Sequence, residues 1–523
     1  TYKRIFVKMQ QYKILWADDE IDLLMPHIIF LKSKGYQVIP VNSGNDALDE
    51  VEKQYFDLIF LDENMPGISG IETLRAIKLS HPNIPVVMIT KNEEEDIMED
   101  AIGSQIADYL IKPLNPNQIL LSVKRLLDKN RIVSEKTNLN YQQNFTDVGY
   151  EIADATDYED WITVYRTLVR WELLIDETNE KDMSEILRTQ KAEANQRFAN
   201  YIRSDYEDWM NSSEGPLLSH QVFKEKVFPA LAQSSVFLIV IDNLRWDQWE
   251  IIEPEIAQLF EIEKKETYFS ILPTTTNYAR NALFAGLMPA DIEKEYPDFW
   301  TKESEEGSKN KFESDLLAAQ LGRHKLEVKY NYHKIIKTQE AKQIEQKLDD
   351  LLKAPLNVLV YNFVDMLSHA RTDMQMIREL APDESAYRAL TKTWFAHSSL
   401  FEVLKKLSSK KVKVMITTDH GTIRVKKPEK IKADRNTNHN LRFKIGKNLG
   451  FNPKSVFHMH KPEVFKLPKL NLTSSYIFAL EESFFAYENN FNHYANLYED
   501  TFQHGGISME EMMIPLITLR QKK

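Results

Sequence analysis

The chain of 523 residues contains no cysteine. This absence excludes disulfide bonds and every metal site built on thiolates. Imidazole, carboxylate and hydroxyl groups remain as plausible metal ligands. Any zinc ion in this protein must therefore be held by histidine and aspartate.

Long apolar segments are also absent. No uninterrupted apolar run approaches the roughly 20 residues that a membrane-spanning helix needs, so we expect no membrane span. Thr1 to Lys8 precede Met9 without the apolar core of a signal peptide, and we leave them out of the fold prediction as an artificial extension or ragged start. The lack of a secretory signal favours a cytoplasmic location.

Positive charge is scarcer than negative charge. The formal net charge of −12 at pH 7 argues against a large surface for the phosphate backbone of DNA. No short basic helix-turn-helix follows the N-terminal region, so we expect no specific binding to duplex DNA. The length exceeds what one hydrophobic core usually supports, and two or three domains are expected.

Between Gln11 and about Asn130, short apolar runs alternate with amphipathic helical patterns. Four helical stretches lie between the runs and a fifth follows them. The runs predicted as strands are Lys13–Ala17, Tyr36–Val41, Asp57–Leu61, Pro85–Thr90 and Ala107–Ile111. This alternation predicts an α/β domain with a doubly wound parallel sheet, in which ligands bind beyond the carboxyl ends of the strands.

Polar side chains with a shared chemistry follow the ends of these predicted strands. They are Asp18, Asp19, Asp62, Thr90 and Lys112. Carboxylate oxygens suit Mg²⁺, a carboxylate can accept a phosphoryl group, and Thr90 and Lys112 could bind its oxygens. Each acid alone would as readily cap a helix, but the complete set predicts a phosphorylation site.

Four segments around these residues resemble the receiver domain of two-component response regulators. They are ADDE at 17–20, FLDENMPGISG at 60–70, MIT at 88–90 and DYLIKP at 108–113. The resemblance implies a flavodoxin-like fold, Asp62 as phosphoryl acceptor, and a sensor histidine kinase as partner. It also implies an Mg²⁺ site formed by Asp18, Asp19, Asp62 and the Asn64 carbonyl, and switch residues Thr90, Tyr109 and Lys112.

Residues 131–219 are highly polar, with tryptophan and leucine at helical spacing, as in Trp161, Leu168, Trp171 and Leu174. This pattern predicts a helical bundle between the receiver domain at 9–130 and a third domain at 220–523. The bundle could relay the receiver's state through a dimer surface. Alternatively, it is a passive spacer with a small core of its own.

In the third domain, acids and imidazoles follow predicted strands. Asp242 follows Val236–Ile241, Asp365 and His369 follow Asn357–Val364, Asp419 and His420 follow Lys411–Thr418, and His504 precedes a final run, Met512–Leu519. A single residue of this kind is more often a helix cap or a core residue. Together they predict a site for two zinc ions.

Another strand-like run, Tyr268–Leu272, is followed by Thr274, Thr275 and Thr276 and then by a helical pattern over Asn277–Leu287. A threonine at a helix start can present its hydroxyl to an anion bound by the free N–H groups. Capping of the helix is the commoner role of such a residue.

This half of the chain resembles the alkaline phosphatase superfamily, and most closely its PglZ branch. Thr276, Gly286 and Pro289 are spaced like the nucleophile, glycine and proline of nucleotide pyrophosphatase/phosphodiesterase members. The resemblance implies zinc-dependent phosphodiesterase activity with Thr276 as nucleophile. Because the threonines are repeated, Thr274 is an alternative nucleophile.

The resemblance also implies how the ligands divide between two zinc ions. Asp242, Asp419 and His420 would hold one ion beside the nucleophile, and Asp365, His369 and His504 would hold the other.

One position departs from those diesterases. They place an asparagine three residues after the nucleophile, where this chain has Ala279, so Asn277 or Arg280 is the candidate for binding phosphate. The nucleophile spacing favours a diester substrate, such as an oligonucleotide or a cyclic nucleotide. The basic run Arg424–Lys432 could steer a polyanion, although such runs are more often solvated loops.

A receiver joined through helices to a PglZ-like domain is similar to the layout of PorX-like response regulators, which are associated with type IX secretion. The layout implies a sigma factor or secretion component as a further partner. We hypothesise that phosphorylation of Asp62 shifts a monomer–dimer equilibrium and thereby the zinc site. The alternative is a non-enzymatic adaptor that zinc merely stabilises.

Overall fold

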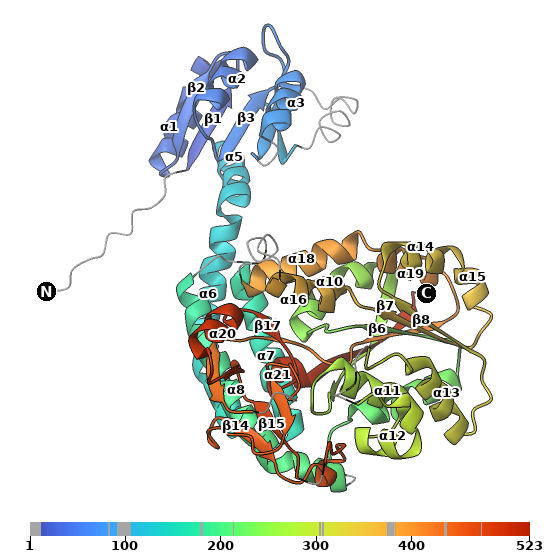
Figure 1. Ribbon diagram of the computed structural model, residues 1–523. Coiled ribbons are helices and arrows are strands. Elements are labelled where there is room, and N and C mark those ends of the chain that lie inside the picture. Colours follow the sequence, from blue (N-terminus) through green and yellow to red (C-terminus); the bar gives the residue numbers. More distant parts are fainter. Residues whose placement is uncertain are drawn as a thin grey trace, which may run out of the picture. The chain divides into compact units, whose positions relative to one another are not determined.

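The chain divides into two compact units (Figure 1). The first comprises Thr1–Asn140 with Glu177–Glu180, and the second comprises Tyr141–Asp176 with Lys181–Lys523. The computed structural model describes residues 12–522, apart from 82–83, 91–105, 178–180, 213, 303–304, 306–307, 374–380, 382, 434–436 and 472.

The first unit contains a five-stranded parallel sheet, as predicted. Its strands are β1 (Lys13–Ala17), β2 (Gln37–Val41), β3 (Leu58–Asp62), β4 (Val86–Thr90) and β5 (Asp108–Ile111). They lie in the order β2-β1-β3-β4-β5, the flavodoxin-like order, and all neighbours are parallel. The order reverses between β1 and β3, so the carboxyl ends of these two strands flank the expected ligand crevice.

Helices cover both faces of this sheet because its strands are apolar on both sides. Leu15 of β1 belongs to the hydrophobic cluster on one face, and Ile14 and Trp16 belong to the cluster on the other. The described helices are α1 (Met25–Ser33), α2 (Gly44–Lys53), α3 (Gly70–Ser80) and α5 (Pro116–Val123). The helix predicted between β4 and β5 lies outside the described residues.

The second unit contains a six-stranded mixed sheet. Its strands are β6 (Val236–Ile241), β7 (Phe260–Phe269), β8 (Tyr330–Ile335), β9 (Leu356–Tyr361), β10 (Lys413–Thr417) and β18 (Met513–Gln521). In the order β7-β18-β10-β6-β9-β8, the last four are parallel, and β18 is antiparallel to both of its neighbours. The α/β fold predicted for this region is therefore confirmed.

The strand predicted at Tyr268–Leu272 is wrong in position. β7 covers Phe260–Phe269, and residues 270–272 follow it as buried irregular chain. β7 lies at the sheet edge, where its middle residues are charged and partly exposed. The apolar signal that the prediction used therefore marks only the end of the strand.

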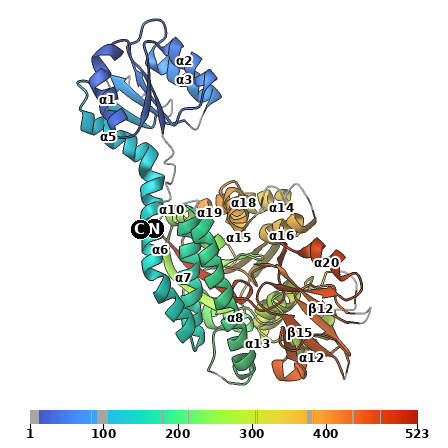
Figure 2. The ribbon, with the colours of Figure 1, turned by 90° about the vertical axis from the view of Figure 1, so that its left-hand side faces the viewer.

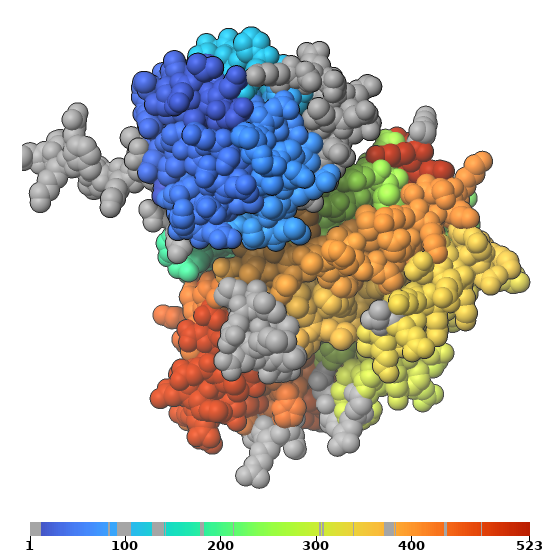
Figure 3. Space-filling model, turned by 90° about the horizontal axis from the view of Figure 1, so that it is seen from above, coloured from blue at the N-terminus to red at the C-terminus, as the bar shows by residue number. Residues whose placement is uncertain are grey.

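Helices pack on both faces of this second sheet (Figure 1). On one side lie α10 (Trp246–Leu259), α14 (Thr338–Gln346), α16 (Phe363–Asp373), α18 (Glu384–Ala396) and α19 (Ser399–Leu407), and on the other lie α11 (Asn281–Ala285), α12 (Pro289–Glu295) and α13 (Glu313–Arg323). Figure 3 shows the yellow and orange surface that residues of the first group form. The helices thereby cover both faces of the sheet, and the ends of its strands remain available to form a site.

The polar central region is helical, as predicted. α6 (Lys129–Asp154) leads to α7 (Tyr158–Asp176) and α8 (Lys181–Asn211), and α7 and α8 lie side by side (Figure 2). Trp161 and Phe198 from these helices belong to the same hydrophobic cluster as Phe269 of β7. The described residues therefore do not form a spacer with a core of its own, because α7 and α8 share the core of the second unit.

Three small sheets complete the second unit, and none was predicted from the sequence. They pair β11 (Ile423–Arg424) with β17 (Phe502–Gln503), β12 (Lys427–Ile431) with β16 (Ser483–Tyr487), and β13 (Phe443–Gly446) and β14 (Val456–Met459) with β15 (Ser475–Ala479). Their strands are short, and apolar residues from segments distant in the sequence pack together in shared hydrophobic clusters.

The basic run at 424–432 lies in these small sheets. Arg424, Lys426, Lys427 and Lys432 each contact an acidic side chain. Positive charge paired in this way attracts a distant polyanion weakly. The contacts favour the structural interpretation of the run over substrate steering.

Among the residues that the structure describes, no helix is both long enough and apolar enough to cross a membrane.

Arg388 on α18 is at the centre of a buried ion network that joins three helices. Its Nη1 atom lies 2.8 Å from a carboxylate oxygen of Glu172 on α7 and 2.8 Å from one of Asp247 on α10. Its Nη2 atom contacts Asp176. Burial raises the pKa of Glu172, but Lys191 and Arg388 outweigh burial and lower this pKa to about 2. Glu172 is therefore ionised at neutral pH and depends on its cations.

Replacing Arg388 should strongly destabilise the second unit. Arg388→Met leaves the carboxylates of Glu172, Asp176 and Asp247 buried without their shared cation, and such a loss typically costs about 3–5 kcal/mol. Arg188→Met is the matched control, because Arg188 pairs with Glu185 on the surface, where both side chains are more than half exposed, and such pairs contribute at most about 1 kcal/mol. Urea unfolding followed by circular dichroism gives both changes. Equal midpoints for the two variants would show that the network contributes no more than a surface pair.

Candidate functional site

In the first unit, the acids predicted at the strand ends converge on Lys112. Its Nζ atom lies 2.6 Å from Oδ1 of Asp62 and 2.8 Å from Oδ2 of Asp18. Oxygen atoms of Asp18, Asp19 and Asp62 lie within 4.8 Å of one another, close enough for one cation to bind all three carboxylates. Asp19 is exposed, so the group opens to solvent on one side.

The electrostatics of this group suit a phosphoryl acceptor. Burial raises the pKa of Asp62, although its bond to Lys112 opposes the shift. Burial also disfavours the charge of Lys112, but hydrogen bonds from Lys112 to Asp18 and Asp62 outweigh burial and raise the pKa of the lysine. Lys112 is therefore positively charged beside Asp62, where a phosphoryl group would bring negative charge.

The remaining predicted receiver residues flank this group. The backbone N–H of Asn64 donates to Oδ2 of Asp62 over 2.9 Å. Thr90 ends β4 and is buried, and Tyr109 lies in the neighbouring strand β5, partly buried against one of the two core clusters. The structure therefore brings Asn64 to the acids and places Thr90 and Tyr109 on the two strands beyond β3.

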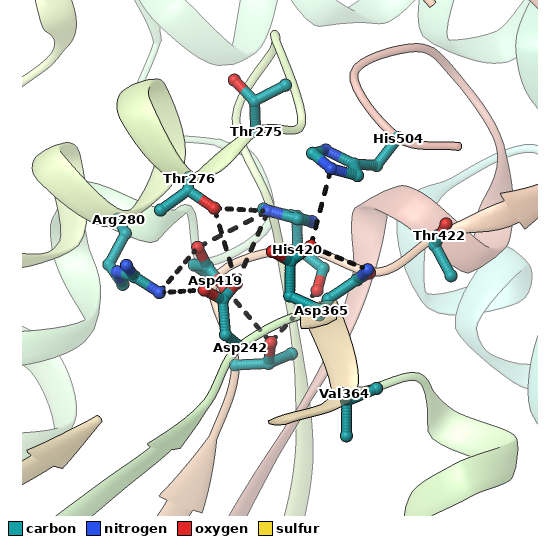
Figure 4. Close-up of polar contacts among 12 residues, drawn as sticks. Asp242, Thr275, Thr276, Arg280, Val364, Asp365, Asp419, His420, Thr422 and His504 are labelled. Atoms are coloured by element: carbon teal, nitrogen blue, oxygen red, sulfur yellow. Dashed lines mark hydrogen bonds and ion pairs between the residues drawn. The ribbon is translucent and has the colours of Figure 1, made fainter. Parts of the chain in front are cut away.

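In the second unit, parallel strands bring five of the predicted metal ligands to the carboxyl end of the sheet, and the loop after β17 brings the sixth, His504 (Figure 4). Asp242 directly follows β6, and Asp419 lies two residues beyond the end of β10. Asp365 lies in the first turn of α16 after β9, with His369 one turn later on the same helix face. Because β10, β6 and β9 are neighbours, these side chains meet as expected.

The first ligand group, Asp242, Asp419 and His420, is fully buried. Nε2 of His420 lies 3.6 Å from Oδ2 of Asp419 and 3.9 Å from Oδ1 of Asp242. All three residues predicted to bind one ion are therefore together.

The second group, Asp365, His369 and His504, is more open. Nε2 of His369 and of His504 lie 3.6 Å and 3.8 Å from Oδ1 of Asp365, and the His369 side chain is 63% exposed. The rings of His420 and His504 stack with centroids 4.3 Å apart, so the two groups adjoin. This arrangement leaves one side of the site accessible from solvent.

The chemistry and spacing of both groups fit zinc. Tetrahedral zinc with bonds of about 2.0–2.2 Å needs ligand atoms roughly 3.4 Å apart, close to the separations here. Burial raises the pKa values of Asp242 and Asp365, a penalty that a bound cation would remove. Burial and the neighbouring imidazoles lower the pKa of His504 well below its usual value, so His504 is neutral and able to bind a metal. Oδ2 of Asp419 is buried and accepts no hydrogen bond from the described residues.

The two candidate nucleophiles have different surroundings. The hydroxyl of Thr276 lies 3.1 Å from Nε2 of His420 and 3.4 Å from Oδ1 of Asp242 (Figure 4). The hydroxyl of Thr274 instead donates to the carbonyl of Gly506 and accepts from the N–H of Gly505. Thr274 therefore holds the loop that carries His504, and Thr276 faces the ligands.

Arg280 is the fixed positive charge of the site. It follows Thr276 in the π-helical turn η5 (Thr276–Arg280) and is fully buried. Its Nη1 donates to Oδ2 of Asp242 over 2.6 Å, and its Nε donates to Glu313. Its Nη2 is buried and has no hydrogen-bond partner among the described residues. Arg280 thus keeps one donor for an anion, whereas Asn277 accepts a hydrogen bond from Thr275 over 2.6 Å.

The sequence analysis missed two residues of the site. Glu313 on α13 binds Arg280, and Asn243 donates from Nδ2 to Asp365 and to Ser368. Asn243 has a positive φ of 67°, a conformation that asparagine adopts more readily than most residues. Its position directly after Asp242 was the one available hint.

Three family models match the chain. The response regulator receiver domain matches residues 14–124, the PorX response regulator linker domain matches 131–210, and the BREX system PglZ alkaline phosphatase-like domain matches 222–519. A receiver domain implies a phosphodonor such as a sensor kinase.

Similar proteins match the receiver region. The transcriptional regulatory protein ZraR of Klebsiella oxytoca is 37% identical over 123 residues, which are 24% of this chain and 28% of ZraR. The alkaline phosphatase synthesis transcriptional regulatory protein PhoP of Bacillus subtilis is 30% identical over 24% of this chain and 53% of its own length. The chain thus spans between about a quarter and about half of these relatives.

Among solved structures, the chemotaxis protein CheY4 of Vibrio cholerae is 28% identical, with a TM-score of 0.22. The match covers 23% of this chain and all of CheY4.

The PglZ model alone covers more than half of the sequence, and the two other models account for most of the remainder. The chain therefore belongs to the PglZ family of alkaline phosphatase-like domains, and it carries this domain behind a receiver domain and a PorX-type linker, the architecture of PorX-like response regulators.

Proposed function

We propose that this protein is a cytoplasmic response regulator whose effector is a zinc-dependent phosphodiesterase. The observation that carries the proposal is the position of the Thr276 hydroxyl, 3.1 Å from His420 and 3.4 Å from Asp242, beside two groups of metal ligands. A hydroxyl next to such groups is the arrangement needed for a nucleophile in phosphoryl transfer.

The chain's own residues divide the chemical tasks. Thr276 attacks phosphorus and its hydroxyl proton leaves toward Asp242 or His420, so that a phosphothreonine forms and the ester oxygen departs. Arg280 offers its free Nη2 to a phosphate oxygen that would otherwise be bound by the asparagine missing at Ala279. Zinc, when bound, would act as a Lewis acid that favours the ionised hydroxyl and stabilises the charge on the transferred group. Water then hydrolyses the phosphothreonine.

A diester is the substrate class that best suits the site. The spacing of Thr276, Gly286 and Pro289 matches that of diesterases, and Gly286 ends α11 with a φ of 62°, which favours glycine. The exposed His369 leaves room for a second ester group on that side. Oligonucleotides and cyclic nucleotides are the proposed substrates.

Regulation is proposed to start at Asp62. A sensor histidine kinase would phosphorylate Asp62 while Mg²⁺ is bound by Asp18, Asp19, Asp62 and the Asn64 carbonyl. Thr90, Tyr109 and Lys112 would then respond to the phosphoryl group. The proposed output is a shift toward a homodimer and a changed diesterase activity. The PorX-type layout supports a role in type IX secretion, with a sigma factor or secretion component as a further partner.

Thr276→Ala should abolish zinc-dependent hydrolysis of bis(p-nitrophenyl) phosphate while zinc is retained. Loss of the nucleophile should lower kcat by about a thousandfold or more, and Thr276→Ser should restore measurable turnover because it keeps a hydroxyl. Metal content and circular dichroism are measured for each variant. If Thr274→Ala is inactive and Thr276→Ala is active, both with zinc bound, Thr274 is the nucleophile. If wild type binds zinc and never turns over, the adaptor alternative is favoured.

Removing metal should lower the melting temperature of the second unit. Zinc at about 100 times its Kd stabilises the folded state by about 2.7 kcal/mol. Without zinc, the carboxylates of Asp242, Asp365 and Asp419 lose that cation. Differential scanning fluorimetry with and without a chelator measures the shift. The combined variant His369→Ala, His420→Ala should lose the shift, whereas His397→Ala should keep it, because the His397 ring bonds to the backbone carbonyl of Thr393 at an exposed helix end. A full shift in the combined variant would refute these ligands.

Beryllofluoride, which mimics the phosphoryl group, should convert the protein to a dimer and change its turnover. Sedimentation velocity and diesterase assays are run with and without the reagent in the presence of Mg²⁺. Asp62→Asn is the control and should respond in neither assay. A treated wild-type sample that stays monomeric with unchanged turnover contradicts the proposed regulation.

A further inference from the structure

We infer that Asn195, on linker helix α8, is a positioning residue for the candidate metal centre, acting through the short helix α21 (Met509–Met512). This inference deepens the proposed function, since it rests on the metal-ligand assignment made above. It makes the linker a structural part of the site rather than a connection to it.

Asn195 fixes α21 with both ends of its amide group. Its Nδ2 donates to Oε2 of Glu510 over 2.9 Å, and its Oδ1 accepts from the backbone N–H of Met509 over 2.8 Å. Asn195 is only 2% exposed, and Glu510 is buried as well. Lys191, one helical turn earlier on α8, adds an ion pair to Oε1 of Glu510 at 3.1 Å. Water cannot readily replace these bonds, so α21 is held where α8 places it.

On its other side, α21 lies directly against the turn that carries His420. The N–H of Gly421 donates to the carbonyl of Glu511 over 3.2 Å. A Cβ atom added to Gly421 would lie 2.0 Å from the carbonyl oxygen of Glu510, so glycine is required for this close approach. A shift of α21 would therefore displace the turn next to His420.

The same helix also holds the loop that carries His504. Oε1 of Glu511 accepts from the N–H of Gly506 over 2.8 Å, and the carbonyl of Gly506 in turn accepts from the hydroxyl of Thr274 over 2.9 Å. The carbonyl of Met512 accepts from the N–H of Ser270, which lies just before the threonines. Both the His504 loop and the nucleophile loop are thus fixed to α21.

These contacts reach both ligand groups at once. His420 belongs to the buried group and His504 to the open group, and the two rings stack on each other. Ligand atoms need to hold their positions within a few tenths of an ångström to bind zinc well. Residues that orient metal ligands indirectly typically contribute 10–100-fold to affinity when tested by mutation.

The test is a comparison of Asn195→Ala with Gln190→Ala in the full chain. Gln190 is a buried amide on the same helix that also makes two hydrogen bonds, but its partners are Tyr141 and Phe145 on α6. Asn195→Ala should weaken zinc binding by about tenfold and should speed amide hydrogen exchange at 419–422 and 504–506. Gln190→Ala should leave both quantities within about twofold of wild type, even where it lowers the melting temperature equally.

A double-mutant cycle separates positioning from general destabilisation. Asn195→Asp alone brings two carboxylates together, and Glu510→Gln alone turns an amide N–H₂ group toward either the Asn195 amide or Lys191, so each should weaken zinc binding. The combined variant exchanges donor and acceptor and leaves an amide oxygen for Lys191, and it should restore affinity and exchange rates to within about threefold.

The outcomes distinguish the two levels of inference. The positioning role is overturned, whether or not zinc binds, by either of two results. One is equal hydrogen exchange at the two loops in Asn195→Ala and Gln190→Ala, and the other is no recovery in the combined variant. If wild type binds no zinc but Asn195→Ala still loosens both loops, the positioning role stands and the zinc-dependent function is the part that fails.

Discussion

Two aspartates buried side by side require positive charge between them, and this constraint organises the second unit. β6 and β10 are parallel neighbours, so Asp242 and Asp419 must meet at one sheet edge. Arg280 supplies part of the compensating charge through its bond to Asp242, and Glu313 holds Arg280 in turn. One oxygen of Asp419 is left without a hydrogen-bond donor among the described residues. A bound cation would offset the negative charge that Arg280 leaves uncompensated.

In the first unit, one lysine supplies the positive charge between two buried aspartates. Asp18 follows β1 and Asp62 ends β3, the two strands at which the strand order reverses, and Lys112, directly after β5, bridges them. The group differs from the zinc-type site in being open to solvent at Asp19 and in offering oxygen ligands only. It therefore suits Mg²⁺ and reversible phosphorylation, whereas the imidazoles of the second unit suit zinc.

Packing makes the linker helices part of the effector. α7 and α8 contribute to the same apolar core as the six-stranded sheet. Arg388 of the effector pairs with Glu172 on α7, and Lys191 on α8 pairs with Glu510 of the effector. A signal that moved these helices would have to move charged groups that cannot be left unpaired. The pair between Lys191 and Glu510 also connects the linker to α21, which contacts the loop of the candidate metal ligand His504.

The sequence alone determined the elements whose signal is local. Buried parallel strands are continuous apolar runs, and ligands follow their ends. The receiver sheet, the strands β6, β9 and β10, and the candidate residues from Asp18 to His504 could therefore be named in advance. Tertiary structure alone decided what depends on partners distant in sequence. The predicted position of the edge strand β7 was wrong because the charged residues of this strand are solvated. Glu313 and Asn195 gave no signal, because in a sequence a buried glutamate or asparagine cannot be told from a surface residue until its partner is known. Thr274 and Thr276 are equivalent in a sequence, and only the fold places one hydroxyl against a backbone loop and the other beside the candidate metal ligands.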